Sequence, residues 1–128
     1  MKLKLTAISL CLPVMAFAGE LKPGSNLVKI THDGHLREMF VRLPEQYDPK
    51  KQYPVIFGFH GAGGPKEGCH RQLERLVHAD KFISVSPQGI SNARGITGWN
   101  GFSGHRISNT DDVGLVRKSV DYLEKNAS

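Results

Sequence analysis

A short apolar run that enters a glycine-rich turn constrains the fold of this chain more than any other feature. Residues 53–59 read Tyr-Pro-Val-Ile-Phe-Gly-Phe and carry no charge. Because the run is apolar at successive positions, both of its faces should be buried, as in a central strand of a covered sheet. The turn that follows, residues 60–64, reads His-Gly-Ala-Gly-Gly. Its glycines allow backbone N–H groups to point into a pocket without steric obstruction.

A strand pair is predicted before this run. Residues 27–31 read as one strand, and residues 32–35 contain Asp-Gly, a strong hairpin signal. Met39, Val41 and Leu43 then alternate with Glu38, Phe40 and Arg42, which is typical of a second strand with one well-buried face.

A helix, a strand and a second helix are predicted after the turn. The first helix covers residues 66–80, and its apolar face consists of Cys69, Leu73, Leu76 and Val77. Residues 81–86 form a buried strand that ends at Pro87-Gln88-Gly89, followed by a glycine-rich loop. The second helix covers residues 111–125, capped by Asn109 or Thr110, with an apolar stripe of Val113, Val116, Val120 and Leu123.

This order of elements predicts an α/β fold. An N-terminal hairpin should be followed by parallel strands that are joined by crossover helices. The last predicted helix has no strand after it, so the sheet should be incomplete, with one flank unfilled and an apolar strand edge exposed.

The glycine-rich turn has two interpretations. Its backbone N–H groups could form an oxyanion hole, as His-Gly-rich turns after the third strand do in lipases and esterases. Alternatively, the glycines satisfy only the backbone angles of a tight turn. A phosphate loop is disfavoured, because the sequence lacks a Gly-Lys-Ser/Thr ending and Pro65 removes a backbone donor.

Other polar residues suggest weaker alternatives. His70, Glu74 and His78 have the spacing of one helix face and could hold a metal, but no fourth ligand is evident, so we predict no metal site and no cofactor. Asp111 and Asp112 could form an acid pair, although capping of the second helix is favoured.

Four motifs, in order, resemble the polyhydroxybutyrate depolymerase and feruloyl esterase group of α/β-hydrolases. They are residues 53–64, Val-Ser-Pro-Gln-Gly at 85–89, Gly-Trp-Asn at 98–100 and Asp-Asp-Val-Gly-Leu at 111–115. With the preceding hairpin, the resemblance covers most of residues 26–125. It implies an ester hydrolase that uses a Ser-Asp-His triad, with serine in Gly-x-Ser-x-Gly after the next strand.

The resemblance also assigns roles to individual residues. Gly61 and Ala62 would donate to the oxyanion, while His60, Gly63 and Gly64 would shape the turn. Trp99 and Asn100 are candidates for a substrate groove, although Trp99 could instead pack the loop. No catalytic residue is assigned, because no serine of the sequence lies in Gly-x-Ser-x-Gly; Gly101-Phe102-Ser103-Gly104-His105 has histidine at the second glycine.

The chain is therefore expected to be the N-terminal part of an α/β-hydrolase domain, residues 19–128, which ends before the nucleophile elbow and is inactive alone. The substrate of the family would be a polyester or a hydroxycinnamoyl–sugar ester. The alternative is a non-catalytic exported module that binds a ligand, or completes its sheet with a second chain.

The first eighteen residues predict export. Lys2 and Lys4 precede an apolar run, and Ala16-Phe17-Ala18 predicts cleavage after Ala18, so the product would be secreted or periplasmic. The run is shorter than the ~20 apolar residues that span a bilayer. Removal of Lys2 and Lys4 lowers the net charge from +5 to +3, with no basic block, so nucleic acid is not an expected partner. Cys69 would then be either a buried thiol or one whose disulfide partner is absent.

Overall fold

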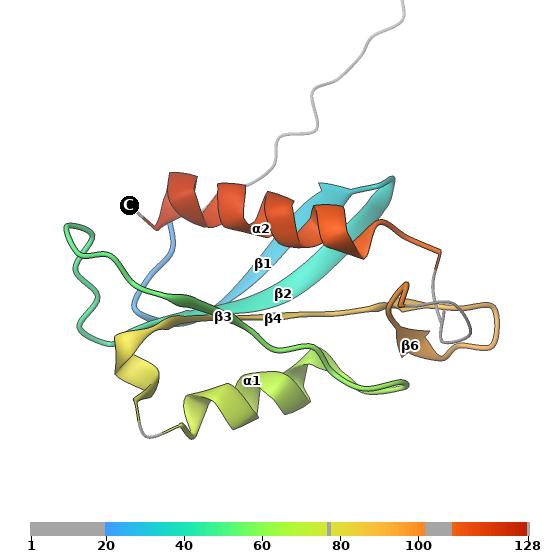
Figure 1. Cartoon of the computed structure of the whole chain (residues 1–128), viewed down its shortest axis with the longest axis horizontal. Coiled ribbons are helices and arrows are strands. Elements are labelled where there is room, and N and C mark those ends of the chain that lie inside the picture. Colours follow the sequence, from blue (N-terminus) through green and yellow to red (C-terminus); the bar gives the residue numbers. More distant parts are fainter. Residues whose placement is uncertain (1–19, 77, 102–108, 128) are drawn as a thin grey trace, which may run out of the picture.

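The computed structural model describes residues 20–76, 78–101 and 109–127, which form a mixed α/β structure (Figure 1). The leader predicted at residues 1–18 and the loop serine Ser103 lie outside the described residues. The elements in chain order are β1 Gly24–His32, β2 His35–Leu43, β3 Val55–Phe57, α1 Lys66–Glu74, the 3₁₀ turn Ala79–Lys81, β4 Ile83–Pro87, β5 Ile90–Ser91, β6 Thr97–Gly98 and α2 Asp112–Asn126.

Within the described residues, the main sheet has four strands in the order β1-β2-β4-β3, and β5 and β6 form a separate small ribbon. β2 is antiparallel to both β1 and β4, whereas β3 and β4 are parallel. The two strands that were predicted after the hairpin, β3 and β4, are therefore parallel as expected, and α1 connects them. The rest of the sheet is antiparallel because the hairpin contributes two of its four strands.

The hairpin is confirmed at the predicted turn. Asp33 and Gly34 both have positive φ, 50° and 71°, and His32 pairs with His35 across the turn. A two-residue turn with this backbone matches the twist of the flanking strands, which explains the preference for Asp-Gly.

The two helices lie on opposite faces of the sheet (Figure 1). α2 covers the face on which the hairpin buries Val28, Ile30, Met39, Val41 and Leu43, and this layer is the hydrophobic core. α1 packs on the other face, close to the end of β3. A Cβ atom on Gly58 would lie 2.9 Å from Cδ1 of Leu73 and 3.2 Å from Cβ of Cys69, so any larger residue would require these side chains to shift.

The first predicted helix is too long. α1 ends at Glu74, and its only buried residue is His70. Leu76, expected on the buried face, lies beyond the helix and is 48% exposed, while Val77 is outside the described residues.

The buried face of the second helix also differs from the prediction. α2 buries Leu115, Ser119 and Leu123, while Val113 is 66% exposed. Its N-cap is Asp111, whose side chain accepts a hydrogen bond from the backbone N–H of Gly114, and neither Asn109 nor Thr110 has this role. Leu123 of the predicted stripe is buried as expected, whereas Val113 is exposed and its place in the buried face is taken by Leu115 and Ser119.

The third strand is shorter than predicted and is not central. β3 lies at one end of the sheet formed by the described residues. Val55 and Ile56 are 38% and 37% exposed, so the burial expected for residues 53–59 is absent at this edge. Within the described residues, the β3 edge of the sheet therefore exposes apolar side chains.

Candidate oxyanion turn

The turn of residues 60–64 connects β3 to α1, and His60 is its buried centre. The Nδ1 atom of His60 lies 2.8 Å from the carbonyl oxygen of Gly61. Its Nε2 atom accepts a hydrogen bond of 2.9 Å from the backbone N–H of Gly89, and the side-chain amide of Gln88 lies 3.0 Å away. Since Nε2 is an acceptor, the proton is on Nδ1, which donates to Gly61. With both nitrogens bonded and the ring 5% exposed, His60 shapes the turn and is not placed to act as a base.

The second half of the turn uses its own amides. The backbone N–H of Gly63 donates to the carbonyl oxygen of Thr97 at 2.8 Å, and that of Gly64 donates to the carbonyl oxygen of Gly61 at 2.9 Å. The hydroxyl of Thr97 donates back to the carbonyl oxygen of Gly64 at 2.9 Å. Gly63 has a φ of +73°, a conformation that favours glycine. These contacts fix Gly63 and Gly64 against the β6 strand.

The first half of the turn leaves its amides unused. Within the described residues, no acceptor receives a hydrogen bond from the backbone N–H of Gly61 or Ala62, and both residues are exposed. A Cβ atom on Gly61 would meet no heavy atom within 4 Å. Two successive backbone donors are therefore available beside open space.

Trp99 connects the glycine-rich loop to this turn, whereas Asn100 connects the loop to the start of α2. The indole N–H of Trp99 donates to the carbonyl oxygen of His60 at 2.8 Å, and its ring centroid lies 5.0 Å from those of both His60 and Phe59. The backbone N–H of Asn100 donates to Asp112 at 2.6 Å. Trp99 thus packs the loop, and its part in a substrate groove stays a prediction.

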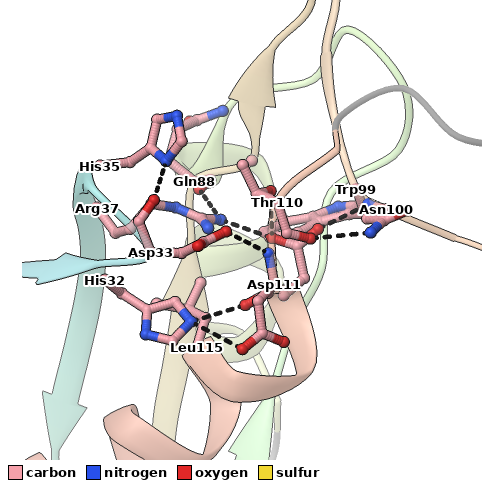
Figure 2. A network of polar contacts seen from close by, with 12 residues as sticks. His32, Asp33, His35, Arg37, Gln88, Trp99, Asn100, Thr110, Asp111 and Leu115 are labelled. Atoms are coloured by element: carbon pink, nitrogen blue, oxygen red, sulfur yellow. Dashed lines mark hydrogen bonds and ion pairs between the residues drawn. The ribbon is translucent and has the colours of Figure 1, made fainter.

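Arg37 is a buried residue of this region that the sequence analysis did not single out. It lies on the same face of β2 as Met39 and is 1% exposed. Its Nη2 atom donates to Asp112 at 2.9 Å and to the backbone carbonyl of Gln88 at 3.2 Å (Figure 2). The alternation that predicted the buried face already placed Arg37 on it, so that pattern was the available signal.

The other predicted clusters are separated by the fold. His78 lies beyond the end of α1, so it does not share a helix face with His70 and Glu74. No group of three or more His, Cys, Asp or Glu side chains in the described part of the chain could hold a metal ion. Asp111 caps α2 while Asp112 pairs with Arg37, so the two carboxylates have different partners.

His70 instead takes part in a small polar cluster between α1 and the hairpin. Its Nε2 atom lies 2.9 Å from the hydroxyl oxygen of Ser25 and 3.2 Å from the carboxylate of Glu74. The hydroxyl of Ser25 donates to Glu74 at 2.8 Å. Burial lowers the pKa of His70, and this effect exceeds the opposite influence of Glu74. The hydroxyl proton points to the carboxylate, so the cluster is not arranged as a nucleophile and base.

Cys69 is a free thiol of intermediate exposure, and partial burial raises the pKa of this thiol. A raised pKa lowers the thiolate fraction, and with it the reactivity of the sulfur.

Comparisons with known proteins do not identify this chain. No protein-family model matches it, and no curated protein is significantly similar to it. Of the helices in the described residues, none is both long enough and apolar enough to cross a membrane.

Proposed function

We propose that residues 60–64 form the oxyanion-binding part of a serine carboxylic-ester hydrolase site of the polyhydroxybutyrate depolymerase or feruloyl esterase type. The observation that supports this proposal is that the backbone N–H groups of the turn differ in their hydrogen bonding. Gly63 and Gly64 donate to carbonyl oxygens of the protein, whereas Gly61 and Ala62 have no acceptor among the described residues. These two are the donors that the family resemblance assigns to the oxyanion.

The chemistry of such a turn follows from where charge develops in ester cleavage. Attack on an ester carbonyl carbon places negative charge on the carbonyl oxygen, and two fixed N–H groups stabilise that charge without reorganisation. The position of the turn, directly after the third strand and before a helix, is the one from which α/β-hydrolases supply an oxyanion donor. The proposed substrate is a polyester or a hydroxycinnamoyl–sugar ester outside the cytoplasm, reached by export through the leader of residues 1–18.

The oxyanion donors can be tested with a carboxylate, which carries two anionic oxygens and resembles an ester-cleavage product. We expect sodium butyrate to shift the backbone amide NMR signals of Gly61 and Ala62, with smaller shifts at Gly63 and Gly64. The affinity should be weak, with a dissociation constant on the order of 10 mM, because two charge-assisted hydrogen bonds are largely offset by the entropy lost on association. Equal shifts at all four amides, or none at Gly61 and Ala62, would contradict the proposal.

The polypeptide of the printed sequence is not expected to turn over esters by itself. None of its serines lies in Gly-x-Ser-x-Gly, and removal of triad members lowers hydrolase rates by several orders of magnitude. The assay is the hydrolysis of p-nitrophenyl butyrate by purified residues 19–128. Hydrolysis that disappears in a Ser103→Ala control would show that this serine is a nucleophile and would overturn the expectation.

A second candidate function is completion of the sheet by another chain. It is favoured by the edge position of β3, where Val55 and Ile56 are exposed. Exposed edge strands recruit further strands through their unpaired backbone groups. We expect sedimentation to show self-association or capture of a partner, weakened by Ile56→Lys. A monomer that unfolds cooperatively and is unchanged by Ile56→Lys would exclude this role.

A further inference from the structure

Arg37 is the starting point of two series of contacts, and both series end at the glycine-rich turn. In the first series, Nη2 of Arg37 donates to the backbone carbonyl of Gln88 at 3.2 Å. The side chain of Gln88 then reaches the Nε2 atom of His60 at 3.0 Å and the carbonyl oxygen of Gly64 at 3.3 Å. The buried arginine is thus two contacts away from both the centre and the end of the turn.

The second series of contacts reaches the turn through the start of α2. Arg37 donates to Asp112 at 2.9 Å, and the other carboxylate oxygen of Asp112 accepts the backbone N–H of Asn100 at 2.6 Å. The neighbouring Trp99 donates its indole N–H to the carbonyl oxygen of His60 at 2.8 Å. Figure 2 shows Arg37 between Gln88 and the segment that carries Trp99 and Asn100.

Both series of contacts begin at a single atom, Nη2 of Arg37. The contacts to Gln88 and Asp112 are made by Nη2 of Arg37, while Nε and Nη1 are buried without a partner among the described residues. The side chain of Arg37 is 0% exposed and that of Asp112 is 11% exposed, so this ion pair is shielded from water and salt. A shielded, charge-assisted pair holds a more fixed geometry than a surface pair does.

We propose that Arg37 is a positioning residue for the oxyanion turn, and that it sets the orientation of the Gly61 and Ala62 amides through Gln88 and through Asp112, Asn100 and Trp99. It does not touch the proposed ligand position. The inference rests on the function proposed above, because the turn is the element that it positions.

The test uses a double variant of the full chain, Arg37→Met with Asp112→Asn. The paired change removes both charges of the ion pair together, because Arg37→Met alone would remove only one of them. The asparagine retains an amide oxygen for the N–H of Asn100. We expect the variant to fold, and the Gly63 and Gly64 amides to exchange with deuterium about tenfold faster through local opening of the turn. The emission of Trp99 should shift as well.

A matched control is available on the same strand. Arg42 of β2 also donates to a backbone carbonyl, that of Ala79 at 2.9 Å, and to a carboxylate, that of Asp80 at 3.0 Å. These contacts lie at the other end of the strand, away from the turn. Arg42→Met with Asp80→Asn should leave exchange at Gly63 and Gly64 unchanged. If both double variants accelerate this exchange alike, or neither does, Arg37 has only a general structural role.

Arg37→Lys supplies a second measurement that does not depend on the folding of the double variant. A lysine ammonium offers one charged nitrogen in place of Nη2. The Gly63 and Gly64 amides of this variant should therefore exchange faster than in wild type but more slowly than in the double variant. Wild-type exchange in Arg37→Lys together with an unshifted Trp99 emission would favour a requirement for charge alone and would overturn positioning by the guanidinium.

The outcome is separable from the proposed function. If butyrate leaves the wild-type Gly61 and Ala62 signals unchanged while Arg37 still controls exchange at the turn, the oxyanion role fails and the positioning role stands. If butyrate binds wild type and the double variant with equal affinity, the positioning role fails alone.

Discussion

Gly61 and Gly63 lie two residues apart in the same turn, and substitution by alanine should separate stability from binding. Gly63 has a φ of +73°, whereas the φ of Gly61 lies outside the left-handed region. In both cases the added Cβ would meet no heavy atom within 4 Å. Steric contact is thus equal at the two positions, and only the backbone conformation differs.

The magnitudes follow from that difference. An L-residue in the left-handed conformation costs about 1–2 kcal/mol, so Gly63→Ala should lower the free energy of unfolding by about 1 kcal/mol after the smaller entropy of the unfolded chain is included. Gly61→Ala carries no such strain, and the reduced unfolded-state entropy should leave stability equal or higher by up to about 0.5 kcal/mol. Its methyl group, however, would occupy the open space beside the two unused amides.

Urea unfolding followed by Trp99 fluorescence measures the first effect. For a domain of this size, 1 kcal/mol corresponds to a lowering of the midpoint by roughly 0.5–1 M. The butyrate titration measures the second effect, and Gly61→Ala should weaken binding severalfold at unchanged stability. Equal destabilisation by both alanines would show that Gly61 is also constrained. Undiminished butyrate binding by Gly61→Ala would show that the anion does not occupy the space beside this residue.

Three further predictions concern the contacts that hold the turn and the helices. Trp99→Phe keeps an aromatic ring but leaves the carbonyl oxygen of His60 without its donor, and urea unfolding followed by far-UV circular dichroism should show a loss of about 1–2 kcal/mol; unchanged stability would mean that water replaces the indole N–H. Burial lowers the pKa of His70 in the folded protein below the ordinary histidine value of about 6.5, which applies to the unfolded state. Between these two pKa values the unfolded state binds more protons than the folded state, so stability should fall as the pH decreases below about 6.5. His70→Gln should reduce this slope between pH 7.5 and 5.5, and an unaltered slope would assign it to other groups. Leu123→Ala should cost about 2–5 kcal/mol, while Val113→Ala should stay within about 0.5 kcal/mol in the same unfolding assay. The reverse order would contradict the burial of Leu123 and the exposure of Val113.

Features encoded by neighbouring residues were predicted well from the sequence. Asp33-Gly34 specifies a two-residue turn, and the hairpin forms there. Residues 83–87 are buried throughout, as the apolar strand before Pro87-Gln88-Gly89 predicted. Each of these features depends on backbone conformations that the local residues select.

The buried face of α2 depended on contacts that the sequence pattern does not encode. The valine stripe follows apolar spacing, but Ser119 is buried because its hydroxyl donates to the carbonyl oxygen of Leu115 and needs no water. The start of the helix is also held by the hairpin, since His32 contacts the backbone carbonyl of Asp111 at 2.8 Å and Asp33 accepts the N–H of Asp111 at 2.9 Å. Tertiary contacts at its N-terminus therefore set the rotation of the helix.

The support of the turn was harder to predict than the turn itself. Arg37 stands on a strand face with Met39, and an arginine there is buried only if a partner compensates its charge. That partner is Asp112, 75 positions later in the chain, with no local signal that connects them. A glycine-rich sequence fixes which backbone angles are allowed, but not which amides find acceptors elsewhere in the protein. The same residues could close on their own carbonyls and bind nothing. The proposed oxyanion role of this turn therefore requires distant residues that restrain Gly63 and Gly64, whereas Gly61 and Ala62 have no acceptor among the described residues.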